Sequence, residues 1–119
     1  MSFELHHLHI KTPDPEKTAA FYVDNLGAEI LGDFLGIGRR LNLHRLTIFL
    51  STPIEDQKHA QHYGLEHLGM IAHDIDSAVE KLTAGRARLL EEIIAKSGRR
   101  IDFFEGPDGV QFELIEAAG

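Results

Sequence analysis

The chain repeats itself at an offset of sixty residues, and this internal repeat is the feature that most constrains its fold. The stretch that begins at Leu5, LHHLHIKTPDPEKTAAFYVDNLG, begins again at Leu65 as LEHLGMIAHDIDSAVEKLTAG. Within it, His7 recurs as His67 at the same place in a short alternating run. Repetition at a fixed offset is typical of one structural unit used twice. We therefore expect two copies of one unit.

The repeat continues beyond its first strand and helix. Residues 38–43, GRRLNL, match residues 98–103, GRRIDF, at the same offset of sixty. The offset becomes sixty-four only near the end, where residues 48–50, IFL, pair with residues 112–114, FEL. The additional residues of the second copy fall on the turn sequence GPDG. The two copies are therefore expected to have the same order of elements.

Composition excludes several classes of protein. The formal net charge of −7 argues against a nucleic-acid partner, because neutralising phosphates needs clustered Lys and Arg. No apolar run approaches the roughly 20 residues of a membrane span, and the N-terminus lacks the pattern of a secretory signal. We therefore expect a cytoplasmic protein without a membrane partner. The chain has no cysteine, so any metal must be held by nitrogen and oxygen ligands.

Local patterns predict the elements of each copy. Alternation from Phe3 to Ile10 predicts a strand, whose residues two apart share a face. Asp14 can cap the helix that follows, with Pro15 at its first position, where the missing N–H costs nothing. Three more strands are expected at 28–35, 39–44 and 46–51. The second copy predicts a strand at 66–72, a helix capped by Asp74 and closed by Gly85, and strands near 87–94, 99–105 and 110–116.

These elements predict an α+β fold made of two tandem βαβββ modules in one domain, residues 1–119. Module one covers about 1–52, a polar connector 53–64, and module two about 65–119. Each half of roughly sixty residues would bury too little apolar surface to be dependably stable alone. We therefore expect the two halves to share a core.

The strand alternation also predicts where polar side chains point. His7 and His9 share one strand face, and Glu113 points away from the side on which Phe112 and Leu114 pack. His67 is expected on the equivalent face of its strand. His7, His67 and Glu113 then give two imidazoles and one carboxylate on rigid strands, a ligand set typical of non-haem Fe(II). The same alternation is also compatible with ordinary surface or hydrogen-bonded core histidines.

Three stretches together resemble one family: HLHIKTPDPEKTAAFYVDNLG, HLGMIAHDIDSAV and FFEGPDGVQFELIE. They are similar to the vicinal oxygen chelate superfamily, which includes glyoxalase I, extradiol dioxygenases, methylmalonyl-CoA epimerase, fosfomycin-resistance thiol transferases and bleomycin-binding proteins. The resemblance implies a glyoxalase-like domain whose curled mixed sheet surrounds a metal cavity. It also implies metal ligands on the first and fourth strands of each module, at positions matched by His7, His67 and Glu113.

The fourth implied ligand position falls on Phe49, which cannot bind a metal. This departure favours the three-ligand relatives, and within them dioxygenase chemistry, on one divalent ion of Fe(II) or Mn(II). A glyoxalase-like lyase or isomerase with Ni, Zn or Co is the alternative, and a metal-free drug- or metabolite-binding dimer, as in bleomycin resistance, is another.

Two residues are expected to do acid–base work. The resemblance implies this role for Glu113, and His9 is a candidate because it lies two residues from His7 on the same strand face. His9 is equally compatible with a hydrogen-bonding residue that lines the cavity. Thr47, Phe49 and Phe103 are expected to line the pocket of a small-molecule substrate. The small two-module relatives imply a homodimer in which strands from two chains complete each site.

Overall fold

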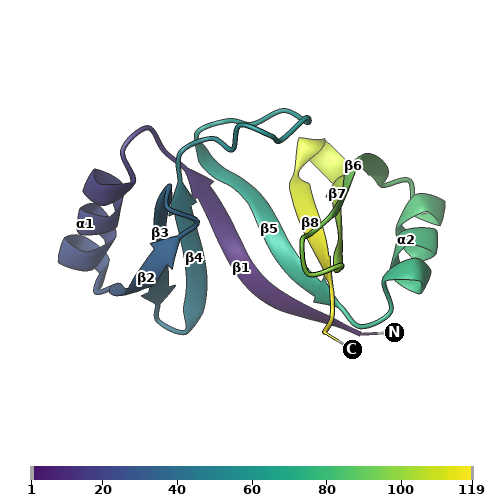
Figure 1. Cartoon of the computed structure of the whole chain (residues 1–119), viewed down its shortest axis with the longest axis horizontal. Helices are drawn as coiled ribbons and strands as arrows, with labels where there is room; N and C mark the ends of the chain where they lie inside the picture. The colour runs from purple at the N-terminus through teal and green to yellow at the C-terminus, as the bar shows by residue number, and fades with distance from the viewer. Residues whose placement is uncertain (1, 119) are drawn as a thin grey trace. The chain divides into compact units, whose positions relative to one another are not determined.

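The structure, a computed structural model, describes residues 2–118 and has the expected α+β fold of two βαβββ modules (Figure 1). The first module contains β1 (Phe3–Lys11), α1 (Pro15–Leu26), β2 (Glu29–Phe34), β3 (Gly38–Leu43) and β4 (Leu46–Ser51). The second contains β5 (Gly64–Ala72), α2 (Ile75–Ala84), β6 (Arg88–Ile94), β7 (Arg100–Glu105), a short 3-10 turn (Pro107–Gly109) and β8 (Gln111–Glu116). The predicted elements are confirmed, with bounds that differ by at most two residues.

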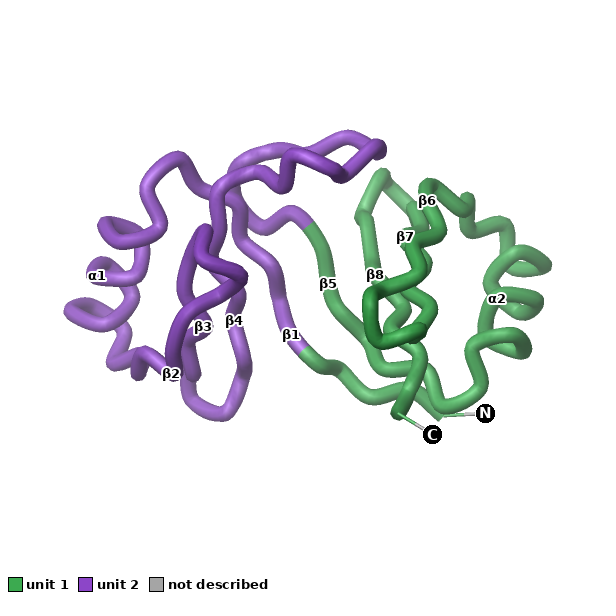
Figure 2. The backbone as a smooth tube through the Cα atoms, in the orientation of Figure 1, with its two compact units in different colours: residues 1–6, 67–119 green, residues 7–66 purple. Residues whose placement is uncertain are grey.

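The chain forms two compact units (Figure 2). The α1 unit consists of residues 7–66 and the α2 unit of residues 1–6 and 67–119. Strand order is β2-β3-β4-β1 in the first module and β5-β8-β7-β6 in the second. In each module the first and last strands are parallel and the other neighbours are antiparallel, which is the same topology twice.

Strand register agrees with the offsets of the sequence repeat. In the α1 unit, His9 on β1 is the partner of Phe49 on β4. In the α2 unit, Gly69 on β5 is the partner of Glu113 on β8. Phe49 therefore holds, within its module, the register position that Glu113 holds in the other.

Each unit packs one helix against one face of its strands. The core of the α1 unit is built from small and aliphatic residues, namely Ala19, Ala28, Leu41, Ile48 and Leu50. The core of the α2 unit consists of Ala72, Ile75, Ala78, Phe104 and Leu114. Each helix contributes a buried alanine to its core, Ala19 in α1 and Ala78 in α2. Residues of the opposite strand phase, which include His7, His67 and Glu113, point away from the helix.

Helix ends follow the sequence signals, with one difference. The Asp14 carboxylate accepts a hydrogen bond from the Lys17 N–H at 3.1 Å, and Gly27 ends α1 in the left-handed conformation at φ 72°. Gly85 follows α2 at φ −80°, and the left-handed position is taken by Arg86 at φ 71°. Between residues 2 and 118 no helix is both long and apolar enough to cross a membrane.

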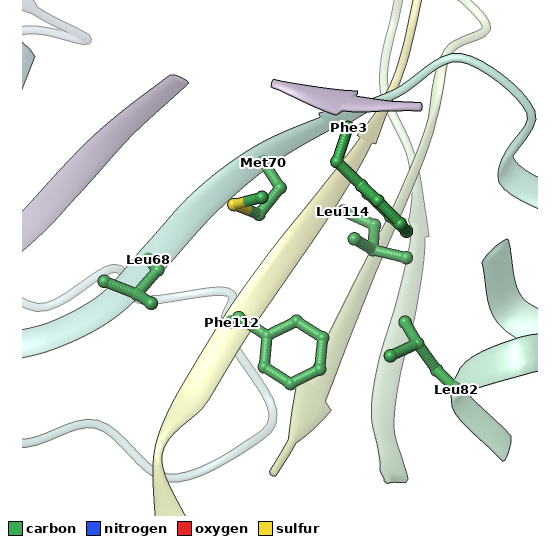
Figure 3. Close-up of a pocket in the computed structure, with 6 residues that line it drawn as sticks. All are labelled: Phe3, Leu68, Met70, Leu82, Phe112 and Leu114. Atoms are coloured by element: carbon green, nitrogen blue, oxygen red, sulfur yellow. The ribbon is translucent and has the colours of Figure 1, made fainter. Parts of the chain in front are cut away.

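An apolar groove of about 270 Å³ lies in the α2 unit (Figure 3). It is lined by Phe3, Leu68, Met70, Leu82, Phe112 and Leu114. The residue that matches Leu82 at the sixty-residue offset is Tyr22, which packs against the core of the α1 unit. The groove is thus lined by a leucine at the position where the α1 unit has the larger tyrosine.

The cap of α2 predicts a pH-dependent stability. Hydrogen bonds from the Ser77 hydroxyl and backbone N–H lower the pKa of Asp74 below its usual value. Because the folded-state pKa is the lower one, the stabilisation is complete above the unfolded-state pKa of about 4 and is lost as the pH falls through the folded-state pKa. Asp74→Ala should therefore lower the Tm at neutral pH, and the difference from the wild-type Tm should shrink as the pH falls.

Thermal unfolding followed by circular dichroism between acidic and neutral pH would measure this difference. Asp24→Ala is a suitable control, because Asp24 lies near the C-terminus of α1, where a negative charge is unfavourable. Its Tm should equal or exceed that of the wild type. A Tm deficit of Asp74→Ala that stayed constant over the whole range would contradict the capping interpretation.

Candidate metal centre

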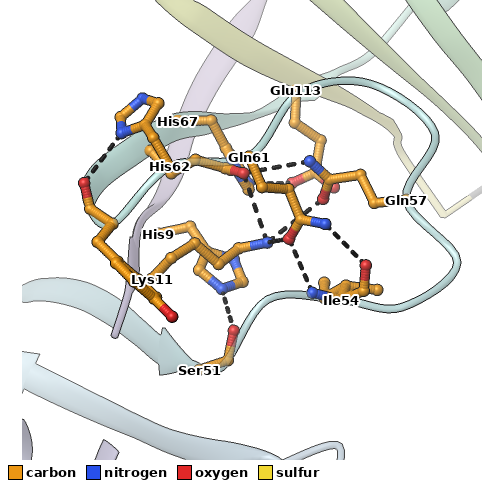
Figure 4. Close-up of polar contacts among 11 residues, drawn as sticks. His9, Lys11, Ser51, Ile54, Gln57, Gln61, His62, His67 and Glu113 are labelled. Atoms are coloured by element: carbon orange, nitrogen blue, oxygen red, sulfur yellow. Dashed lines mark hydrogen bonds and ion pairs between the residues drawn. The ribbon is translucent and has the colours of Figure 1, made fainter. Parts of the chain in front are cut away.

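Two buried histidines of β1 lie on one strand face of the α1 unit. His7 and His9 are each 2% exposed, and their ring centroids are 6.1 Å apart. Nε2 of His9 lies 2.7 Å from Oγ of Ser51, which is also buried at the end of β4 (Figure 4). This hydrogen bond fixes the orientation of the His9 ring.

Aromatic rings pack against both histidines. Phe49 stacks on His7 with ring centroids 4.1 Å apart, and Phe34 of β2 lies 4.8 Å from Phe49. Phe34 also meets His9 edge to face at 5.2 Å. Thr47, two residues before Phe49 on β4, is half-buried on the same strand face. The α1 unit therefore presents its two imidazoles against an aromatic wall.

The α2 unit brings a histidine and a carboxylate together. Nε2 of His67 lies 3.6 Å from Oε1 of Glu113, and their side chains are 2% and 12% exposed. Phe103, the cross-strand partner of Glu113, meets the His67 ring edge to face at 5.3 Å. These three residues share the strand face opposite α2. A nitrogen and an oxygen at this separation can turn toward one cation.

The opposite face of β7 carries an ion-pair cluster that belongs to the packing of α2. Asp102 is fully buried and binds the guanidinium of Arg100 through both carboxylate oxygens, at 3.2 Å and 2.8 Å. Arg100 also pairs with Asp76 of α2 and Glu92 of β6. Burial raises the pKa of Asp102, whereas the hydrogen bond to Asp102 raises the pKa of Arg100. This cluster faces away from His67 and has a structural role.

The structure assigns several sequence-predicted residues to one unit or the other. His7, His9, Thr47 and Phe49 belong to the α1 unit, whereas His67, Phe103 and Glu113 belong to the α2 unit. The imidazoles of His7, His9 and His67 are all buried and each offers a ring nitrogen that could bind a metal ion.

Sequence reasoning missed three residues near the predicted ones. Ser51, Phe34 and Lys11 contact or neighbour the histidine face, and none belonged to the predicted ligand set. Of the three, only the position of Lys11 could have been predicted from the sequence, because the alternation of His7 and His9 places it on the same strand face. The other two reach His9 from separate strands, through contacts that no local pattern encodes.

Comparison with known proteins agrees with the fold. The family model described as Glyoxalase/Bleomycin resistance protein/Dioxygenase superfamily matches residues 4–114, so the chain belongs to this superfamily. Its relatives include the uncharacterized proteins YwkD of Bacillus subtilis and YaeR of Escherichia coli, at 31% and 28% identity. YwkD aligns over 94% of this chain and 95% of its own length, and YaeR over 95% of each.

Solved structures share the fold over nearly the whole chain. A hypothetical protein from Bacillus halodurans superposes with a TM-score of 0.75 at 21% identity and covers 100% of this chain and 97% of its own. Methylmalonyl-CoA epimerase from Mycobacterium tuberculosis superposes with a TM-score of 0.69 at 24% identity and covers 97% and 88%. At these identities the likeness establishes the fold.

The contact between His9 and Ser51 generates a stability prediction. Ser51→Ala removes a buried hydrogen bond and should lower the free energy of unfolding by about 1–3 kcal/mol. Ser97→Ala, at an exposed position, is the matched control and should lie within about 0.5 kcal/mol of the wild type. Denaturant titration measures both. Equal unfolding free energies for the two variants would show that the bond does not contribute to stability.

Proposed function

We propose that this protein is a metal-dependent enzyme that binds a small oxygen-rich substrate on a divalent ion held by His7, His67 and Glu113. Two imidazoles and one carboxylate are the donor set typical of non-haem Fe(II), and oxygen-rich sites also accept Mn(II). The short separation of His67 and Glu113, both nearly removed from solvent, supports this donor set. His7 supplies the third ligand from the α1 unit of the same chain or of a second copy.

The position of Phe49 is the main reason for favouring one type of chemistry over the others. It occupies in β4 the register position that Glu113 occupies in β8, and its ring stacks on His7. A phenyl ring donates nothing to a metal, so the protein would supply three ligands and leave the remaining positions to substrate and water. Such an open centre favours a substrate that chelates through two oxygens, and dioxygenase-type oxidation is the reaction we favour.

The side chains around the ion would have separate tasks. A bound divalent ion supplies Lewis acidity toward substrate oxygens and, with iron, a redox centre. His9, held by Ser51, would exchange a proton with the substrate in a fixed ring orientation. Thr47, Phe49 and Phe103 would bound the substrate pocket, and the rings would exclude water from its apolar part.

A second candidate is a lyase or isomerase reaction on Ni, Zn or Co, in which Glu113 or His9 moves a proton next to a carbonyl. Several structures that share the fold are methylmalonyl-CoA epimerases, and this observation favours the alternative. Three protein ligands argue against it, because a Glu113 that left the ion to act as a base would leave only two histidines on it.

The protein is also proposed to act as a cytoplasmic homodimer in which two chains complete each site. The proposal follows the small two-module relatives, whose domains the chain resembles over nearly its whole length. Sedimentation of the purified protein, compared with its 13.3 kDa chain mass, would give the number of copies.

Metal content tests the ligand set. The wild type, purified without added metal or chelator and reconstituted if necessary, should carry close to one iron or manganese ion per chain. His7→Ala and Glu113→Ala should each retain less than about a tenth of that metal, because loss of one of three ligands leaves too few donors. His73→Ala is the control, since His73 is an exposed residue paired with Glu4, and should bind metal as the wild type does. Inductively coupled plasma mass spectrometry gives all four values.

The identity of the metal then separates the candidate reactions. Iron or manganese would be followed by oxygen-uptake assays with catechols, and nickel, zinc or cobalt by assays with hemithioacetals and 2-oxo compounds. A wild type that binds no metal after reconstitution would refute the enzyme proposal in favour of a metabolite-binding dimer. Unchanged metal in both ligand variants would refute the ligand set alone.

Phe49 offers a gain-of-function test. Phe49→Glu should add a fourth ligand and lower the metal dissociation constant by about tenfold, equivalent to about 1.4 kcal/mol. Phe49→Leu, which stays apolar, should leave the constant within about a factor of two. Competition with a chelating dye measures both. If the glutamate variant bound metal no more tightly than the leucine variant, Phe49 would not stand at a ligand position.

A further inference from the structure

A buried ion pair lies at the end of the strand that carries His7 and His9. The side chains of Lys11 and Glu66 are both 0% exposed, and Nζ of Lys11 lies 3.5 Å from Oε2 of Glu66. Both residues belong to the α1 unit. Burying two charges costs free energy unless additional hydrogen bonds satisfy their remaining donors and acceptors. The other hydrogen-bond partners of Lys11 and Glu66 therefore show how the structure tolerates the pair.

Two glutamines from the connector between β4 and β5 complete this pair (Figure 4). Lys11 donates to Oε1 of Gln61 at 2.6 Å and to Oε1 of Gln57 at 3.3 Å. Gln57 in turn donates through Nε2 to Oε2 of Glu66 at 3.1 Å. The Gln57 amide therefore bridges the cation and the anion, and its orientation is fixed by both.

Gln61 forms hydrogen bonds within the connector. Its Oε1 accepts from the Ile54 N–H and its Nε2 donates to the Ile54 carbonyl, both at 2.7 Å. The Ile54 carbonyl also accepts from the Gln57 N–H at 3.2 Å. The segment 54–61, here called the strap, is thus a closed loop whose side-chain amides meet at the Lys11 ammonium.

We infer that Lys11 is the positioning residue that anchors the strap and keeps solvent away from the His9 end of the strand face. Lys11 follows His9 by two residues and shares its face, and Ser51, which binds His9, directly precedes the chain segment that leads into the strap. His9 is 2% exposed although it lies near the end of β1. The strap has neither helix nor strand of its own, so these side-chain bonds hold it in place.

The ion pair occurs once and is not repeated with the modules. Lys11 lies on β1 and Glu66 on β5, and the sixty-residue offset pairs them with Ile71 on β5 and His6 on β1, so the equivalent positions carry no lysine–glutamate pair. The anchor is therefore not a general requirement of a βαβββ module. Solvent access and strap order can be measured on chelator-treated protein, independently of whether the proposed metal enzyme is correct.

The test compares strap protection in Lys11→Met with the wild type by hydrogen–deuterium exchange and mass spectrometry. Exchange of the peptide that covers 52–63 should become at least about tenfold faster, because the Ile54 and Gln57 amides lose their ordered partners. The peptide that covers α1 should be unaffected. Carbethoxylation of His9 should also become at least about tenfold faster, with the exposed His73 as internal reference. Lys81→Met, at an exposed site on α2, is the matched control and should match the wild type in both readouts.

Lys11→Met also leaves Glu66 buried without its cation, which could weaken the whole unit. The double variant Lys11→Met/Glu66→Met removes both charges and should regain the wild-type Tm, because an apolar pair can replace a buried ion pair. Its strap should still exchange quickly. Gln61→Met, which keeps the ion pair, should give the same fast exchange.

The outcomes separate anchoring from stability alone. Fast strap exchange and fast His9 modification in the double variant, at a wild-type Tm, establish Lys11 as the anchor. Wild-type protection of the strap in Lys11→Met, or its full recovery in the double variant, would overturn the inference. Strap exchange that accelerated without any change at His9 would overturn the part that concerns solvent access.

Discussion

The parallel pairing of the first and last strands in each module determines which side chains meet on the strand face that the helix leaves uncovered. In a parallel pair the register fixes which residues stand side by side, and one helix covers one strand face. The uncovered face therefore collects alternate residues from two strands that are far apart in sequence. In the α2 unit this places His67 next to Glu113, and in the α1 unit it places His7 next to Phe49.

The two modules share a backbone plan and differ in chemistry at a few positions. Phe49 stands where the other module has Glu113, and Lys11 stands where it has Ile71. One module thus offers an imidazole and a carboxylate, whereas the other offers two imidazoles, an aromatic wall and a buried cation. The proposed open coordination sites follow from this asymmetry, because only one of the two modules places a carboxylate at this register position.

The connector makes ordered side-chain contacts as well as linking the two modules. Its polar composition is usual for a solvated loop, yet two of its glutamines solvate a buried charge pair. Amide groups are suited to this task because each carries both a donor and an acceptor. A loop held in this way is ordered by a few directional contacts rather than by an apolar core, so small changes in it can alter access to the strand face.

The repeat, the strand alternation and the cap residues determined the element order, the βαβββ plan and the strand face on which the histidines lie, because all of these depend on local periodicity. Only tertiary structure placed Ser51 on His9, forty-two residues away, and Gln61 on Lys11, fifty residues away. It also gave the left-handed position after α2 to Arg86 instead of Gly85. Such pairings follow from how strands and loops pack, and side chains separated by forty or fifty residues leave no periodic signal in the sequence.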